Sequence, residues 1–189
     1  MTTLELVIGD KNLSSWSLRP WLVLRQAGIP FEERLVPFAT DGWRERVADL
    51  SPSRRVPALR HGELLVWESL AICEHLAETF PDAALCPRDA AARAVARAVS
   101  AEMHAGFAHL RRDLPMDVVA RVPRRLLASE TEADVARVLA IWTDCLARFG
   151  QGGPFLFGRF SIADAMFAPV AFRFRTYDVP VGEPRARAW

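Results

Sequence analysis

A valine–proline pair and a glutamate–serine pair, eleven residues apart, are the residues whose types and spacing suggest ligand-binding chemistry. A cis bond between Val56 and Pro57 would leave the N–H and C=O of Val56 free to hydrogen-bond an extended peptide. At the start of the next predicted helix, Ser69 offers a hydroxyl beside backbone amides, which suit a carboxylate, and Glu68 suits an ammonium group. An extended peptide with a free amino acid head fits both pairs. A structural alternative stays open, because a proline before a strand and a Glu-Ser helix start are both common.

The order and spacing of these two pairs resemble the N-terminal domain of the cytosolic glutathione transferase family. The resemblance implies that glutathione is the co-substrate and that both pairs bind it. It also implies that Arg55 contacts or flanks the glycyl carboxylate of glutathione, although a solvated surface position is the commoner fate of an arginine. Family members usually carry a glycine where this chain has Arg54.

Three serines and a tryptophan, Ser14-Ser15-Trp16-Ser17, follow the first apolar strand and open the first helix. Thiol–disulfide exchange needs a thiolate, which this segment lacks, so we do not expect that chemistry here. A serine hydroxyl at a helix N-terminus can instead donate a hydrogen bond to the sulfur of bound glutathione and favour its thiolate form. Each unit by which the pKa of the thiol falls requires about 1.4 kcal/mol of preference for the anion.

The segment that ends at Arg19 is similar to the Ser-Ser-Cys-x-x-Arg motif of zeta-class glutathione transferases, in which the first serine is catalytic. The similarity implies that Ser14 is the catalytic residue, with Ser15 as the reserve. Trp16 replaces the cysteine of the motif and Pro20 follows the arginine, and both departures weigh against zeta-type isomerase activity. The structural alternative is that Ser14 and Ser15 merely cap the helix.

The resemblance implies an enzyme, a glutathione S-transferase that ionises the thiol of glutathione and directs the thiolate at a small electrophile. Trp16, Met103 and Phe107 are expected to line the pocket for that second substrate, although such residues at helical spacing more often form a core. Two alternatives stay open: a glutathione-dependent cis–trans isomerase similar to maleylacetoacetate isomerase, and a non-catalytic glutathione-binding or stress-response module. Family members are mostly homodimers, so the resemblance also implies a homodimer.

The elements that must position these residues follow the order β-α-β-α-β-β-α over the first eighty residues. Apolar patterns and turn residues predict strands at 4–8 and 31–36, a hairpin over 56–66, and helices at 17–26, 43–50 and 69–79. This order is typical of an α/β thioredoxin-like domain with a mixed sheet, because parallel pairing of the first two strands needs a crossover helix.

Strand patterns largely end after a linker that contains Phe80-Pro81 and Cys86-Pro87. Amphipathic helices are predicted over 88–113, 130–149 and 161–172, and Ser161 to Asp164 form a predicted capping box that resembles the one in the family. We therefore expect the glutathione transferase fold, with a thioredoxin-like domain over 1–81 and an all-α helical bundle over 88–189. Family members usually continue for one or more helices, so we expect this bundle to lack its last helices.

Composition excludes several other classes of protein. The net charge is +1 and no basic block occurs, so nucleic acid is not an expected partner. No run of 18 apolar residues and no signal peptide is found, which predicts no membrane span and a cytoplasmic location. The three cysteines are widely spaced and form no CxxC pair, so we expect no disulfide framework and no metal site.

Overall fold

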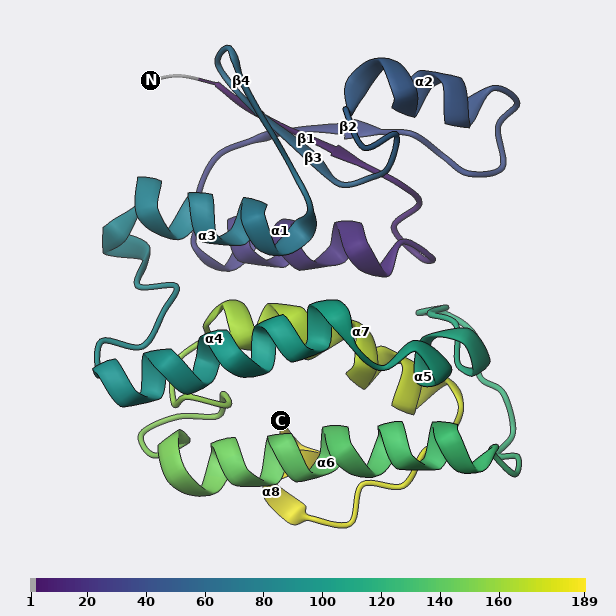
Figure 1. Ribbon diagram of the computed structural model, residues 1–189, viewed down its shortest axis with the longest axis vertical. Helices are drawn as coiled ribbons and strands as arrows, with labels where there is room; N and C mark the ends of the chain where they lie inside the picture. Colours follow the sequence, from purple (N-terminus) through teal and green to yellow (C-terminus); the bar gives the residue numbers. More distant parts are fainter. Residues whose placement is uncertain (1–2) are drawn as a thin grey trace. The chain divides into compact units, whose positions relative to one another are not determined.

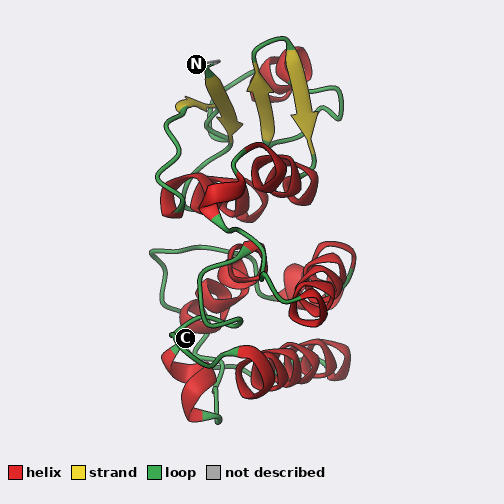
Figure 2. Cartoon of the chain, turned by 90° about the vertical axis from the view of Figure 1, so that its left-hand side faces the viewer, coloured by secondary structure: helices red, strands yellow, loops and turns green. Residues whose placement is uncertain are grey.

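The structure of the chain is a computed structural model that describes residues 3–189. The chain divides into two compact units, Met1–Ala83 and Ala84–Trp189. The four strands of its sheet all belong to the first unit, whereas the second unit is built of helices and loops (Figure 2). Among the described residues, no helix is both long enough and apolar enough to cross a bilayer.

The first unit has the predicted β-α-β-α-β-β-α order. Its strands pair in the order β2-β1-β3-β4, with β1 parallel to β2 and antiparallel to β3, and with β4 antiparallel to β3. This is the expected mixed sheet of a thioredoxin-like unit. The elements are β1 (Leu4–Ile8), α1 (Ser15–Gln26), β2 (Glu32–Leu35), α2 (Trp43–Leu50), β3 (Ala58–His61), β4 (Leu64–Trp67), α3 (Ser69–Thr79) and a short 3₁₀ turn, η1 (Pro81–Ala83).

Strand β1 is buried because successive side chains of a strand point to opposite faces and helices cover both faces of this sheet. Helices α1 and α3 lie side by side along one face, and α2 lies on the other (Figure 1). Val7 of β1 packs with Val47 and Leu50 of α2. The sheet is therefore the central layer of the first unit.

The second unit is a helical bundle, as expected, in which α4 packs against α7, and α6 packs against α5 and α8 (Figure 1). The prediction of a single helix over 88–113 is wrong, because the helix is interrupted at Gly106 and Phe107. Phe107 has a left-handed conformation with φ 59°. A Cβ at Gly106 would lie 2.9 Å from the carbonyl oxygen of Glu102, so glycine permits this tight helix end. The helices are α4 (Ala90–Ala105), α5 (Ala108–Asp113), α6 (Ser129–Phe149), α7 (Ile162–Thr176) and α8 (Pro184–Ala188).

The buried carboxylate of Asp164 joins three segments of the second unit. The capping box with Ser161 is present, and Asp164 Oδ2 accepts from the N–H and hydroxyl of Ser161 at 2.9 and 2.8 Å. Asp164 Oδ1 accepts from the N–H of Leu156 at 2.9 Å and from the indole N–H of Trp189 at 2.8 Å. Burial raises the pKa of Asp164, although these hydrogen bonds oppose the rise. Both oxygens are thus satisfied, as burial of a polar group requires.

The carboxylate of Glu33 on β2 fixes helix α1 to the sheet. It accepts from the indole nitrogen of Trp21 at 2.9 Å, pairs with Lys11 at 2.5 Å and also pairs with Arg25. Burial would raise the pKa of Glu33, but the hydrogen bonds from Lys11, Trp21 and Arg25 outweigh it and lower the pKa from 4.5 to about 2. The ionised carboxylate therefore stabilises the fold at neutral pH.

We predict that Glu33→Gln lowers the free energy of unfolding by about 2 kcal/mol at pH 7. Because the folded pKa lies below the unfolded one, this contribution is present above pH 4.5 and is lost as the pH falls toward 2. Urea denaturation of both proteins from pH 7 to pH 3 should show a difference that shrinks with acidification. The control is Glu32→Gln, at an exposed neighbouring position. A difference that stays constant with pH would contradict the role of the ionised carboxylate.

Candidate functional site

The register of strand β3 brings the predicted ligand-binding segments to one end of the sheet. Ala58, the first residue of β3, pairs with Val7 of β1 on one side and with Trp67 of β4 on the other. Both neighbours run antiparallel to β3, so the chain after β1, the chain before β3 and the chain after β4 all leave the sheet at that end. These segments carry the Ser14, Val56 and Ser69 positions respectively.

Gly9, the first residue after β1, lies close to the Val56 segment. A Cβ at this position would lie 3.1 Å from Cγ2 of Val56 and 2.3 Å from the ring of Phe38, so a side chain has no room. The N–H of Gly9 donates to the hydroxyl of Ser17 at 3.1 Å. The glycine therefore permits the close approach of the Val56 segment to the start of α1.

The Val56–Pro57 bond is cis, which is the conformation that the proposed role of Val56 requires. Pro57 is buried and Val56 is half-buried. Among the backbone hydrogen bonds of residues 3–189, none uses the N–H or the C=O of Val56. Both groups are thus available to an extended ligand backbone, which is the role that the sequence suggests for them.

The two arginines before Val56 differ in backbone conformation. Arg54 has φ 57°, in the left-handed region that favours glycine. The side chain of Arg55 is exposed. An exposed guanidinium at this end of the sheet can reach an anionic ligand without losing an existing partner in the core.

Ser69 is a buried residue whose hydroxyl lacks a partner. The residue is 1% exposed and opens helix α3, and within residues 3–189 its Oγ makes no hydrogen bond. Glu68 immediately before it is exposed and has φ 69°. A buried hydroxyl without a partner is costly, so it indicates a group that arrives from outside the chain. The N-terminal amides of α3 favour a negatively charged group there.

Ser14 is the N-cap of helix α1 and is 7% exposed. Its hydroxyl donates to the hydroxyl of Ser17 at 2.8 Å and accepts from the N–H of Ser17 at 3.4 Å. With the bond from Gly9 to Ser17, these contacts form a short chain of hydrogen bonds that ends next to Val56. The hydrogen bond between Ser14 and Ser17 was not predicted from the sequence, where Ser14 was expected to be the catalytic residue and capping was the structural alternative.

Ser15 is the first residue of α1 and is also buried. Its C=O accepts from the guanidinium of Arg19 at 3.2 Å, and that guanidinium lies 4.2 Å from the ring centroid of half-buried Trp16. Arg19 is 1% exposed. Arg19 was identified in the sequence as the last residue of the motif, but its burial was not predicted, for which the Ser-Ser-x-x-x-Arg pattern is the available signal.

Met103 and Phe107 belong to the second unit, where they are 0% and 7% exposed. Their burial is compatible with the core role that the sequence left open, and their place in a second-substrate pocket stays a prediction. Among the described residues, no group of three or more His, Cys, Asp or Glu side chains could hold a metal ion.

Two family models match most of the chain. The model described as the glutathione S-transferase N-terminal domain matches residues 13–79, and the model described as the glutathione S-transferase C-terminal domain matches residues 93–189. The chain belongs to the glutathione S-transferase family. Its fold, a thioredoxin-like unit followed by a helical unit, is that of the family.

Similar proteins carry two kinds of name. A probable maleylacetoacetate isomerase from Caenorhabditis elegans is 33% identical over 51% of this chain and 44% of its own length. Glutathione S-transferase L3 from Arabidopsis thaliana is 26% identical over 90% of this chain and 70% of its own length. The crystal structure of a glutathione transferase homologue from Burkholderia, with bound glutathione, is 26% identical and covers 98% of this chain and 88% of its own, with a TM-score of 0.73. The match thus spans less than half of the isomerase.

Proposed function

We propose that this glutathione S-transferase family member binds glutathione in its first unit and activates the thiol for attack on a small electrophile. The observation that carries the proposal is the buried hydroxyl of Ser69, which has no hydrogen-bond partner within residues 3–189. It lies at the same end of the sheet as the N–H and C=O of Val56, which no backbone hydrogen bond of the described residues uses. The two positions meet at one end of the sheet because Ala58 pairs with Trp67. One extended peptide with a carboxylate can satisfy both.

Each part of glutathione has a matching group in this site. The N–H and C=O of Val56 would pair with the backbone of the cysteinyl residue, as a neighbouring strand does. The hydroxyl of Ser69 and the amides of α3 would hold the carboxylate of the amino acid head, and Glu68 its ammonium group. Exposed Arg55 would hold the glycyl carboxylate.

The hydroxyl of Ser14 would stabilise the glutathione thiolate. Two hydroxyls 2.8 Å apart can exchange donor and acceptor roles, so Ser17 can donate to Ser14 and release the hydrogen of Ser14 for a bound sulfur. A free thiol has a pKa of about 8.5, and one charge-assisted hydrogen bond together with the N-terminus of α1 would lower it by about one to two units. The pKa of the bound thiol would then lie at about 6.5 to 7.5, so a substantial fraction would be thiolate near neutral pH.

We predict that Ser69→Ala weakens glutathione binding by at least about tenfold, because it removes a hydrogen bond to a charged group. The same change should leave the ligand-free protein equally or more stable, since it removes a buried hydroxyl without a partner. Calorimetric titration and thermal melting would measure the two effects. The control is Ser100→Ala in α4, where the hydroxyl donates to the C=O of Ala96 at 2.7 Å. An unchanged affinity of Ser69→Ala for glutathione would contradict the assignment of Ser69 to the carboxylate site.

We predict that Ser14→Ala lowers turnover with a chlorodinitrobenzene at least about tenfold while the dissociation constant of glutathione barely changes. The ultraviolet absorbance of bound thiolate should appear at higher pH than in the unchanged protein, because the hydrogen bond to sulfur is lost. Loss of the cap should also cost about 1 kcal/mol of stability. Ser15→Ala is the matched comparison, since Ser15 is not the cap. An unchanged rate and thiolate pKa in Ser14→Ala would assign the role to Ser15 or to backbone amides.

The isomerase reaction is the second candidate, because several similar proteins are named maleylacetoacetate isomerase. Turnover of maleylacetone without reaction of a chlorodinitrobenzene would support it. Saturable glutathione binding without thiolate formation or turnover would support the non-catalytic binding module.

The proposal includes a homodimer in the cytoplasm. Leu64 and Trp67 of edge strand β4 are exposed apolar side chains, which suits a strand that another chain covers. Sedimentation velocity would show twice the mass of one chain if this is correct.

A further inference from the structure

The second unit contains a cavity of about 400 Å³ that the proposed glutathione chemistry does not use. A volume of this size accommodates a small organic molecule. The segment that leads into α4, the end of α6 and the loop before α7 enclose it, with the lining residues Ala84, Cys86, Pro87, Arg88, Asp89, Ala92, Phe149, Phe157, Arg159, Phe160 and Ser161.

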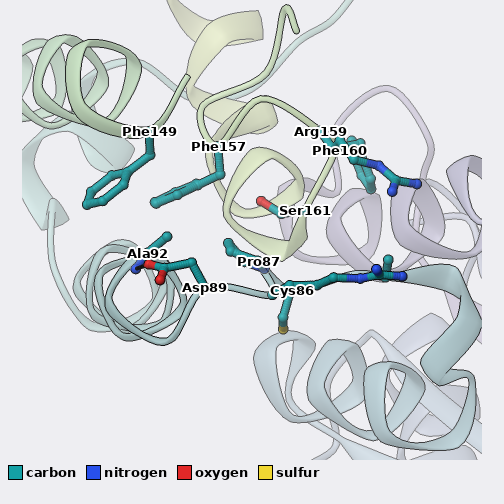
Figure 3. A pocket seen from close by; sticks show the side chains of 11 residues that line it. Cys86, Pro87, Asp89, Ala92, Phe149, Phe157, Arg159, Phe160 and Ser161 are labelled. Atoms are coloured by element: carbon teal, nitrogen blue, oxygen red, sulfur yellow. Dashed lines mark hydrogen bonds between the residues drawn. The ribbon is translucent and has the colours of Figure 1, made fainter. Parts of the chain in front are cut away.

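Aromatic rings form one wall of this cavity. Phe149 and Phe157 stack with ring centroids 5.5 Å apart and an angle of 20° between their planes. Figure 3 shows the two rings side by side above Ala92 of α4, with Arg159 at the opposite end of the cavity. Both phenylalanines are half-buried. Such a wall favours a flat apolar or aromatic group, which can add to the stack.

The charge at the cavity is positive. Arg88 and Arg159 are exposed, and within residues 3–189 neither forms an ion pair with a carboxylate. The lining carboxylate, Asp89, accepts from the N–H of Ala92 at 2.8 Å and thereby caps α4. Two guanidinium groups therefore remain for an anion, and a guanidinium can bind a carboxylate through two parallel hydrogen bonds.

The lining segments are held in place without a ligand. Arg93 donates to the C=O of Pro87 at 3.1 Å and to that of Arg88 at 2.7 Å, and the N–H of Ile162 donates to the C=O of Leu85 at 2.9 Å. In the loop before α7, a Cβ at Gly153 would lie 1.9 Å from the carbonyl oxygen of Gly158, so these backbones pack directly. A site that is formed in advance binds at lower entropic cost.

We propose that this cavity is a second ligand site, which takes a small planar aromatic carboxylate. The ring lies against Phe149 and Phe157, and the carboxylate contacts Arg88 and Arg159. The site shares no residue with the proposed glutathione groove, so the two ligands do not compete for the same side chains.

Calorimetric titration with naphthoate and with neutral naphthamide tests the proposal. Naphthoate should bind at least about tenfold more tightly than naphthamide, because charge-assisted hydrogen bonds to arginine are strong. The double variant Arg88→Gln, Arg159→Gln should reduce this preference to about one, and Phe157→Leu should weaken binding of both ligands. Saturating glutathione should leave the affinity unchanged. Thermal melting would confirm that the variants are folded.

The matched control is Arg124→Gln, an exposed arginine that lines a different cavity of the same unit. This variant should bind naphthoate as the unchanged protein does. The proposal is overturned if millimolar naphthoate shows no saturable binding, if the double variant keeps its preference for naphthoate, or if glutathione displaces the ligand. It is also overturned if Arg124→Gln is the variant that loses binding.

Discussion

Strand β3 is paired on both sides, and the geometry of the candidate glutathione site depends on this pairing. Ala58 lies opposite Val7 and Trp67, so three segments that are distant in the sequence leave the sheet together. A shift of either pairing by one residue would turn the side chains of that strand to the opposite face and move Ser69 away from Val56. The buried apolar residues of β1 and β3 prevent such a shift, because it would expose them to water.

Two buried polar side chains in this chain differ in whether their hydrogen bonds are formed within the protein, and this difference distinguishes a structural role from a ligand-binding role. Asp164 accepts four hydrogen bonds from Leu156, Ser161 and Trp189. The buried carboxylate therefore links the start of α7 to Trp189. The hydroxyl of Ser69 has no hydrogen-bond partner among the described residues, although the residue is also buried. The first arrangement stabilises the fold by itself, whereas the second gains its stabilisation when a ligand supplies the missing partner.

Much of the first unit was predictable because local patterns and turn residues agree there. The strands and the helices are found close to where the sequence places them. The break between α4 and α5 was not predicted, because the apolar helical pattern of Met103, Phe107 and Leu110 continues past Gly106. The contacts of Glu33 also join residues that lie apart in the sequence, so no short pattern reveals them. The residue types of the candidate site could be predicted from the sequence. That these residues lie at one end of the sheet follows from the strand register, which the sequence does not show directly.

The three cysteines of this chain differ sharply in accessibility. Cys73 and Cys145 are buried, and burial raises the pKa of Cys145 to about 12, whereas Cys86 is half-buried in the segment before α4. A maleimide dye or a nitroxide would therefore attach first at Cys86 under mild conditions, without removal of the other two thiols. Since Cys86 follows the boundary between the two units, a spectroscopic label there would report on the mobility of the segment that leads into α4.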